Sequence, residues 1–135
     1  MRVQSLQKMS KKNLQPDWKS MLEPMAYSVT REGSTERPFS HPGFPADTNC
    51  FLCVCCDQVL FSIDAKYDSG SGWPSFSSPY SSQAISEHSD ESYGMIRTEV
   101  KCNKCEAHLG HVFEDGPKPT GLRYCINGAA IEGKK

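Results

Sequence analysis

Long apolar runs and large aliphatic side chains are scarce in this sequence of 135 residues. Fewer than one residue in five is Leu, Ile, Val or Phe, and the longest unbroken apolar run covers residues 50–56. A membrane helix needs about 20 such residues, so the sequence predicts none. Because the net charge is only -1, the small aliphatic content does not indicate disorder. It predicts a folded domain whose thin core needs an additional cross-link.

An excess of charge of either sign is also missing. The 15 Lys and Arg residues nearly cancel the 16 Asp and Glu residues. The chain therefore has no basic excess that could neutralise a phosphate backbone, and no nucleic-acid partner is expected. Residues 1–16 contain basic residues, no acid and no apolar stretch typical of a secretory signal. We expect residues 1–16 to be a flexible N-terminal tail and residues 17–135 to be a single domain. The protein is expected to be cytoplasmic, without a membrane partner; the alternative is a weak mitochondrial targeting signal in the tail.

Cysteine, in contrast, is abundant, with seven in the chain. Since no secretory signal is present, metal binding or thiol chemistry is expected rather than a disulfide framework. Two Cys-x-x-Cys pairs have the spacing of zinc knuckles: Cys53 with Cys56, and Cys102 with Cys105. Together they predict a four-cysteine zinc site, which is structural because four thiolates leave no position open for water. Cys50 with Cys53 is an alternative first knuckle, but Cys56 is favoured because a turn and strand-like residues follow it.

The remaining pattern is typical of a mainly β fold. Asp17 is placed to cap a short helix and Pro24 to begin another, so short helices are expected over 17–31. The proline-rich residues 35–50 and the serine-rich residues 77–93 are expected to be loops. Strands are expected over 59–63, 93–102, 109–113 and 122–126. The sum is an antiparallel β domain with helices at its N-terminal end.

Cys125 belongs to neither knuckle and lies in the last expected strand. Residues two apart in a strand share a face, so Arg123, Cys125 and Asn127 project together. A guanidinium beside a thiol favours the thiolate and lowers the pKa of the thiol, which makes Cys125 a candidate nucleophile. The alternative is an inert cysteine on a solvated strand face.

Two histidines, His108 and His111, follow the second knuckle closely. Imidazoles near a reactive thiol suit proton transfer near neutral pH, although histidines also bind zinc or pack in cores. Trp73 lies in the turn-rich segment 68–74, where its indole offers a flat apolar wall to a small group such as a methyl. The alternative is an indole that covers the core. Two further histidines fall in expected loops and are interpreted as surface residues: His41 and His88.

Several long stretches, in this order, resemble the methionine sulfoxide reductases of type B, which act on the R epimer of methionine sulfoxide. They are TREGSTERPFS (30–40), FLCVCC (51–56), KYDSGSGWPSF (66–76), GMIRTEVKCNKCEAHLGHVFEDGP (94–117) and TGLRYCINGAAI (120–131). The resemblance spans about residues 17–131. It implies a fold of two antiparallel sheets, often called a β-tent, with short N-terminal helices and a structural four-cysteine zinc site.

The resemblance also implies a role for each candidate residue. Cys125 is implied to be the nucleophile, which becomes a sulfenic acid as it reduces free or protein-bound methionine (R)-sulfoxide. Trp73 is implied to pack against the methyl group of the substrate, and Phe113 is expected to add to substrate binding. The other implied catalytic groups are His108, His111, Asn127 and Arg123. Thioredoxin or another thiol is implied to regenerate the enzyme, and a monomer is expected.

Two positions depart from many members of that family. Ser71 stands where they have a second, resolving cysteine in the loop before the tryptophan, so the usual internal disulfide with Cys125 is not expected. The second thiol is then Cys50, Cys55 or one from an external reductant. Gly128 stands where many members have serine, and a small effect is expected from that change.

Two other classes of function fit the sequence less well. A zinc-ribbon module that binds nucleic acid or protein needs basic and aromatic residues around its knuckles, where the sequence offers only Lys101 and Lys104 near the second. A zinc-stabilised scaffold without chemistry provides no reason for Arg123, Cys125 and Asn127 to share a strand face.

Overall fold

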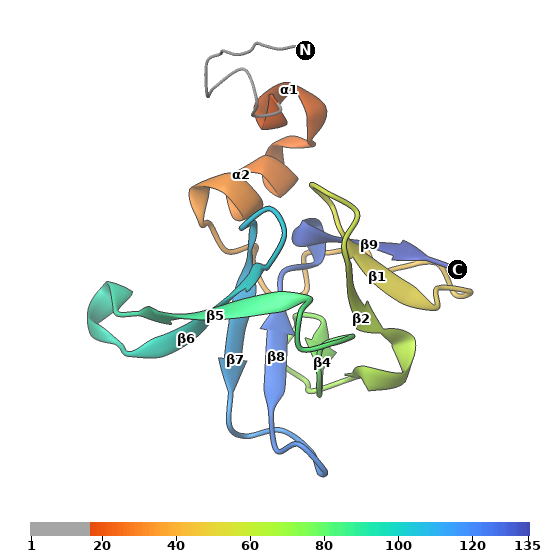
Figure 1. Ribbon diagram of the computed structural model, residues 1–135, viewed down its shortest axis with the longest axis vertical. Coiled ribbons are helices and arrows are strands. Elements are labelled where there is room, and N and C mark those ends of the chain that lie inside the picture. The colour runs from red at the N-terminus through yellow and green to blue at the C-terminus, as the bar shows by residue number, and fades with distance from the viewer. Residues whose placement is uncertain (1–16) are drawn as a thin grey trace.

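The computed structural model describes residues 17–135, so the tail predicted over 1–16 lies outside the described residues. Two short helices, α1 (Trp18–Met21) and α2 (Pro24–Glu32), come first and lie at the top of Figure 1. Pro24 begins α2, where its missing N–H removes no hydrogen bond, and Gly33 ends it with a left-handed φ of 73°. Asp17 is at the N-cap of α1, but its side chain makes no capping hydrogen bond. Between residues 17 and 135, no helix is long and apolar enough to cross a membrane.

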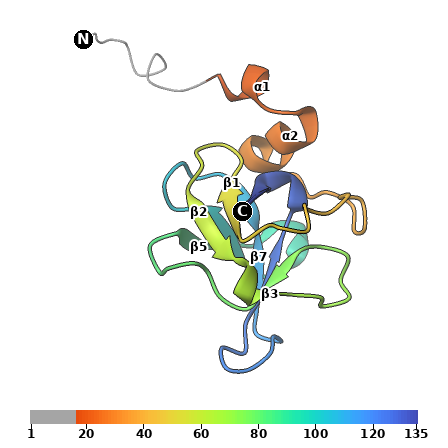
Figure 2. The ribbon, with the colours of Figure 1, turned by 90° about the vertical axis from the view of Figure 1, so that its right-hand side faces the viewer.

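The two predicted antiparallel sheets are present. A three-stranded sheet has the order β2-β1-β9, and a six-stranded sheet has the order β3-β4-β8-β7-β6-β5. The strands are β1 (Cys50–Cys53), β2 (Val59–Ser62), β3 (Lys66–Tyr67), β4 (Ser75–Phe76), β5 (Ile85–Asp90), β6 (Arg97–Cys102), β7 (His108–Phe113), β8 (Arg123–Ile126) and β9 (Ile131–Lys134). Short 3-10 turns lie between some of them: η2 (Ile63–Ala65), η3 (Ser92–Gly94) and η4 (Gly128–Ala130). Figure 2 views the molecule from the side on which β1, β2 and the C-terminus lie.

The core lies between the sheets, and four aromatic rings pack among its aliphatic side chains. Phe51 and Phe61 come from the three-stranded sheet, and Phe76 and Tyr124 come from the six-stranded sheet. The rings of Phe61 and Phe76 stack with their centroids 4.2 Å apart, and Phe51 meets Phe76 edge-on at 5.1 Å. Val29 of α2 is fully buried in the same cluster. The aromatic rings thus add apolar surface to that of the aliphatic side chains in the core.

The structure has strands that were not predicted: β1, β3, β4, β5 and β9. The largest difference is in one hairpin. The serine-rich segment 77–93, predicted to be a loop, contains β5, which pairs with β6 over its whole length. Because β5 is the edge strand and carries polar side chains on both faces, it lacks the alternation that marks a half-buried strand. The strand predicted over 93–102 begins only at Arg97, since Tyr93 takes a left-handed φ of 58° in η3, where the chain reverses. The β5–β6 hairpin projects from the body of the molecule at the left of Figure 1.

Candidate active site and metal centre

The four knuckle cysteines meet although they belong to different sheets. Cys53 and Cys56 lie at the turn from β1 to β2, and Cys102 and Cys105 lie at the turn from β6 to β7. Their four sulfur atoms all lie within 4.8 Å of one another. Two sulfur pairs, Cys53–Cys105 and Cys56–Cys102, are 3.6 Å apart, which is close to the roughly 3.8 Å between thiolates arranged tetrahedrally about 2.3 Å from one ion. This donor set fits a metal ion, which would connect the two sheets.

Both knuckles use the same backbone turn, and α2 supports one of them. The residue after each pair, Asp57 or Glu106, has a left-handed φ of 65° or 64°, and its N–H donates to the carbonyl of the first cysteine of the pair. Arg31 of α2 donates to the carbonyl oxygen of Cys105 at 2.9 Å and lies 3.5 Å from its sulfur. A fixed cation beside the thiolates offsets their negative charge, so α2 belongs to the metal centre.

Cys125 lies in β8 between two neighbouring strands. Its partners across them are Ser75 of β4 and His111 of β7, and directly opposed residues project from the same face of a sheet. The next pair on that face is Arg123 with Phe113, in which the guanidinium carbon lies 4.5 Å from the ring centroid. The structure therefore places Arg123 and Cys125 on one face, as the strand alternation predicts.

Cys125 also lines a cavity of about 100 Å³. The cavity is formed by Thr35, Trp73, Arg97, Gly110, His111, Phe113, Cys125 and Asn127. Five of the predicted site residues, from three separate segments of the chain, thus meet around one space. Its volume suits the end of one side chain rather than a larger ligand. Two predicted residues lie outside this lining: His108 is next to His111, and Arg123 is next to Phe113.

A β-bulge brings the two histidines to the same face of β7. The register between β6 and β7 shifts between Val100 and Lys101, and without such a bulge residues three apart would face opposite ways. The centroids of the two imidazoles are 5.6 Å apart. An acid from the β5–β6 hairpin orients each ring, as two contacts show: His108 Nδ1 lies 2.7 Å from Glu99, and His111 Nε2 lies 2.7 Å from Asp90.

Burial and hydrogen bonds set the charges around the cavity. The hydrogen bond with His111 holds the pKa of Asp90 well below its usual range. Burial lowers the pKa of His108 although Glu99 opposes the shift, so this imidazole is neutral at pH 7. Burial raises the pKa of Cys125, and the nearby Arg123 offsets only part of that rise. Arg123 thus lowers the pKa of Cys125 as predicted, but desolvation outweighs its influence and the net shift is upward.

Glu36, which the sequence analysis missed, fixes Trp73 and Asn127 in place. Its backbone carbonyl accepts the indole N–H of Trp73 at 3.0 Å, and its backbone N–H donates to the side-chain oxygen of Asn127 at 3.0 Å. Its carboxylate is buried and accepts the backbone N–H groups of Gly128 at 2.7 Å and Ala129 at 2.9 Å. A single acid in a proline-rich loop has no periodic signal, so only its place inside the matched stretch 30–40 pointed to it.

Further residues around the cavity were missed for different reasons. Asp90 bonds both His111 and Arg97, but it lies in the segment that was predicted to be a loop. Arg97 and Glu99 lie on the face of β6 opposite the buried residues. The alternation of β6 predicted that face but not that it borders the cavity. Gly110 is required because a Cβ there would overlap the carbonyl group of Cys125, a constraint that becomes visible only once β7 and β8 are paired.

The spare cysteines do not line the Cys125 cavity. Cys55 lies beside the four-cysteine cluster, where its thiol neighbours are Cys105 and Cys53. Cys50 lines a separate hollow formed with residues of β9. Ser71 lies near Cys125 and lowers the pKa of its thiol, but a hydroxyl cannot form a disulfide.

His41, interpreted as a surface residue, packs against the turn after β8. Its ring lies 4.7 Å from that of Phe44, centroid to centroid. A Cβ on Gly128 would overlap the His41 side chain. A serine at this position would therefore require the His41 side chain to shift.

Comparisons with known proteins identify relatives over most of the chain. A family model described as the SelR domain matches residues 22–135. A protein of Pseudomonas fluorescens (strain Pf0-1) named peptide methionine sulfoxide reductase MsrB is 53% identical over 117 residues, which cover 86% of this chain and 89% of the relative. Proteins of the same name are 55% identical over 117 residues in Pseudomonas syringae pv. syringae (86% of this chain, 89% of the relative) and 51% identical over 117 residues in Acinetobacter baumannii strain AYE (86% and 84%). The chain therefore belongs to the SelR-domain family, the type B methionine sulfoxide reductases that its motifs resemble.

Proposed function

We propose that this protein reduces methionine (R)-sulfoxide to methionine, with Cys125 as the nucleophile. The observation that carries the proposal is the small cavity in which Cys125, His111 and Trp73 meet. A nucleophilic thiol, a proton donor and a flat apolar wall are the groups that reduction of a methyl sulfoxide requires. The relatives named peptide methionine sulfoxide reductase MsrB, which share about half of the residues, support the same reaction.

The reaction transfers one oxygen atom from substrate sulfur to Cys125. The Cys125 sulfur attacks the sulfoxide sulfur, the S–O bond breaks, and the oxygen passes to Cys125 as a sulfenic acid while methionine leaves. The substrate sulfur gains two electrons and the cysteine sulfur loses two. Because burial keeps Cys125 protonated at rest, the thiol supplies the proton that the oxygen takes, and His111 relays it as the neighbour across β7 and β8.

The other residues position these groups. Trp73 and Phe113 enclose the methyl group, and Asn127 lines the cavity beside the sulfur. Arg123 stabilises the thiolate that forms during the attack, since its charge favours the ionised thiol. His108 contacts His111 and is held neutral by burial, which favours transfer of the proton through His111.

An external thiol is the proposed reductant. Neither Cys50 nor Cys55 lines the cavity, so a thiol of thioredoxin or a small molecule attacks the sulfenic acid and releases water, leaving a mixed disulfide on Cys125. A second thiol then attacks this disulfide and frees Cys125. Ser71 occupies the position from which an internal thiol would have reacted.

We also propose that the four-cysteine cluster holds one zinc ion in a structural role. All four donors are thiol groups, which suit zinc, and four ligands leave no open position for a substrate. None of the four lines the Cys125 cavity, so the metal supports the site without contacting the substrate.

Replacement of Cys125 by serine tests the proposal. With racemic methionine sulfoxide and dithiothreitol, we expect the native protein to consume half of the substrate, because only the R epimer reacts. C125S should be inactive and should keep its metal, whereas the control C50S should keep both activity and metal. Turnover by C125S, or consumption of the S epimer, would refute the assignment.

A further inference from the structure

Two hollows adjoin the Cys125 cavity, and we propose that the three together form a furrow that binds an extended polypeptide with an apolar residue on each side of the oxidised methionine. This inference rests on the proposed function and adds the subsites that select the substrate. The contacts for the two flanking residues are Phe39 on one side and Tyr93 on the other.

Three adjoining hollows form the furrow. The middle one is the Cys125 cavity of about 100 Å³. It shares Trp73 with a hollow of about 580 Å³ lined by Phe39, and it shares Thr35, Arg97 and His111 with a hollow of about 530 Å³ lined by Tyr93. The middle space is small enough to select one side chain, while the outer two are wide enough for its neighbours.

Phe39 and Tyr93 are held at the surface in strained backbone. Their side chains are 79% and 89% exposed, and their φ angles are left-handed at 62° and 58°. Bulky residues rarely adopt this conformation, and it costs about 1–3 kcal/mol. Among residues 17–135, the other non-glycine residues with such angles are Asp57 and Glu106, which close the two knuckles. Tyr93 takes this angle where the β5–β6 hairpin reverses. Phe39 closes neither a knuckle nor a hairpin, so its strained exposure points to a function at the surface.

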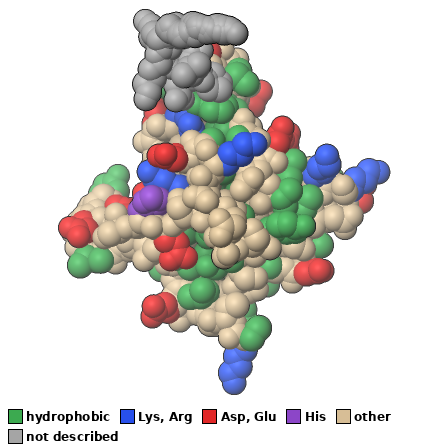
Figure 3. All heavy atoms as spheres, viewed as in Figure 1, with side chains coloured by type: hydrophobic (Ala, Val, Ile, Leu, Met, Phe, Trp, Pro, Cys, Tyr) green, Lys and Arg blue, Asp and Glu red, His purple; other side chains and the backbone are tan. Residues whose placement is uncertain are grey.

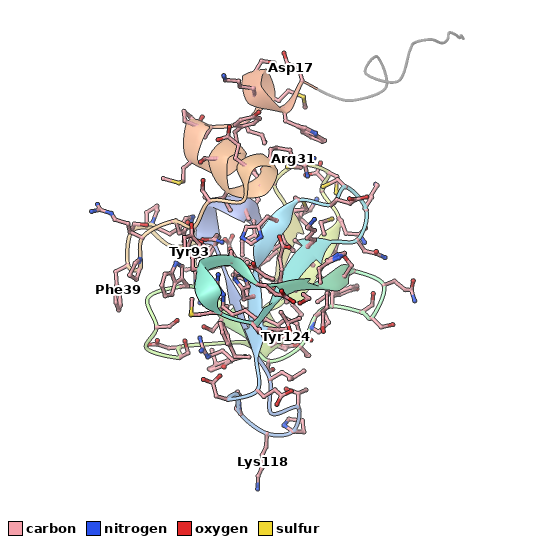
Figure 4. The ribbon with its side chains drawn as sticks, turned by 90° about the vertical axis from the view of Figure 1, so that its left-hand side faces the viewer. Asp17, Arg31, Phe39, Tyr93, Lys118 and Tyr124 are labelled. Carbon is pink, nitrogen blue, oxygen red and sulfur yellow. The ribbon has the colours of Figure 1, made fainter. Side chains whose placement is uncertain are left out.

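Each of the two aromatic residues is attached to a segment that carries part of the site. The N–H of Phe39 donates to the carbonyl of Gly72 at 2.7 Å, immediately before Trp73. Tyr93 is in η3, between the strands that carry Asp90 and Arg97. Figure 4 shows both rings toward the same side of the molecule. Figure 3 shows hydrophobic side chains at the projecting end of the hairpin, where Met95 and Ile96 are also exposed.

The carboxylates beside Tyr93 are paired with neighbouring groups. Beside Tyr93, Asp90 is paired with His111 and Arg97, and Glu99 is paired with His108. Both carboxylates that line the Tyr93 hollow are therefore paired. The Phe39 hollow also includes Lys66 and Asp68, so the preference for apolar neighbours comes from the two aromatic rings and not from charge. Apolar side chains that cover Phe39 and Tyr93 would gain binding free energy from buried apolar surface, which free methionine sulfoxide cannot do.

Substitution of both aromatics by asparagine tests the furrow, because asparagine tolerates left-handed φ and preserves the backbone. Three substrates are compared: a peptide with leucine on both sides of methionine (R)-sulfoxide, the same peptide with serine instead, and N-acetylmethionine (R)-sulfoxide. For F39N/Y93N we expect kcat/KM to fall about tenfold on the leucine peptide and to stay unchanged on the other two. The control Y80N changes a tyrosine that is 61% exposed and lines none of the three hollows, so all three values should stay unchanged.

The other outcomes separate this inference from the proposed function. An unchanged kcat/KM on the leucine peptide overturns the furrow, while continued reduction of N-acetylmethionine (R)-sulfoxide keeps the reductase assignment. An equal fall of kcat/KM on all three substrates also overturns the furrow, because the two rings would then support the cavity itself. A dimer that dissociates in F39N/Y93N, measured by sedimentation, would mean that a second copy covers the furrow. No reduction of any substrate by the native protein would instead overturn the proposed function.

Discussion

At the scale of single residues, the carboxylate of Glu36 connects the groups that surround the cavity. It is 3% exposed and accepts two backbone N–H groups, from Gly128 and Ala129, while the backbone of the same residue holds Trp73 and Asn127. A buried carboxylate with these partners is a positioning group for the indole and the amide. Its replacement should therefore affect stability and activity together.

In E36Q, the amide nitrogen would face one of those N–H groups and leave it unpaired. We expect the free energy of unfolding to fall by about 1–3 kcal/mol, measured by urea denaturation. The kcat/KM should also fall at a temperature where the variant is fully folded, because Trp73 and Asn127 lose their fixed positions. E32Q, at the exposed end of α2, is the matched control, and identical behaviour of the two variants would contradict the role of Glu36.

Burial of Cys125 makes a second prediction at this scale. Because desolvation raises the pKa of this thiol, its rate of alkylation by iodoacetamide should still be rising at pH values above the ordinary thiol pKa. Arg123 lowers the same pKa, so R123M should move the midpoint to higher pH. The modified residue is identified by mass spectrometry of peptides, since other thiols also react. A midpoint below the ordinary value, or no shift in R123M, would contradict the electrostatic account.

At the scale of elements, strand alternation and knuckle spacing predicted more than the loops did. The patterns of β6 and β8 predicted which side chains share a face, and the Cys-x-x-Cys spacing predicted which sulfur atoms meet. Alternation reports the face that a residue occupies but not what lies opposite. The contacts of Asp90 with His111 and of Glu36 with Gly128 join distant segments, so no local pattern contained them. The edge strand β5 was missed because solvent on both sides removes the alternation.

That edge strand matters because it brings Asp90 to His111. In D90N, the imidazole loses its anionic partner, and we expect kcat to fall about tenfold or more because the proton donor is no longer oriented. S89A, the neighbouring residue on the same strand, is the control. The pKa of Asp90 is depressed in the folded protein, so its stabilising effect is present above the ordinary carboxyl pKa of about 4 and is lost as the pH falls. The melting temperatures of D90N and the native protein should therefore differ at pH 7 and converge in acid; equal values at both would contradict the pairing.

At the scale of the whole molecule, the cysteine cluster joins the two sheets at one edge of the core that they enclose. One knuckle ends β1 of the three-stranded sheet, and the other ends β6 of the six-stranded sheet. The second knuckle also leads directly into β7, which carries His108 and His111. A metal ion here would therefore hold the sheets together and fix the start of the strand on which the histidines lie.

Loss of the metal should unfold much of the protein and not merely reduce its activity. Because the ligands converge only in the folded chain, the free energy of metal binding contributes to the free energy of folding. We expect C102S to bind no zinc, to melt at a much lower temperature than the native protein in circular dichroism, and to lose activity in parallel. C50S, which changes a thiol of β1 outside the cluster, should bind one zinc ion per chain and melt like the native protein. A C102S protein that melts at the native temperature would show that the aromatic core holds the two sheets together without the metal.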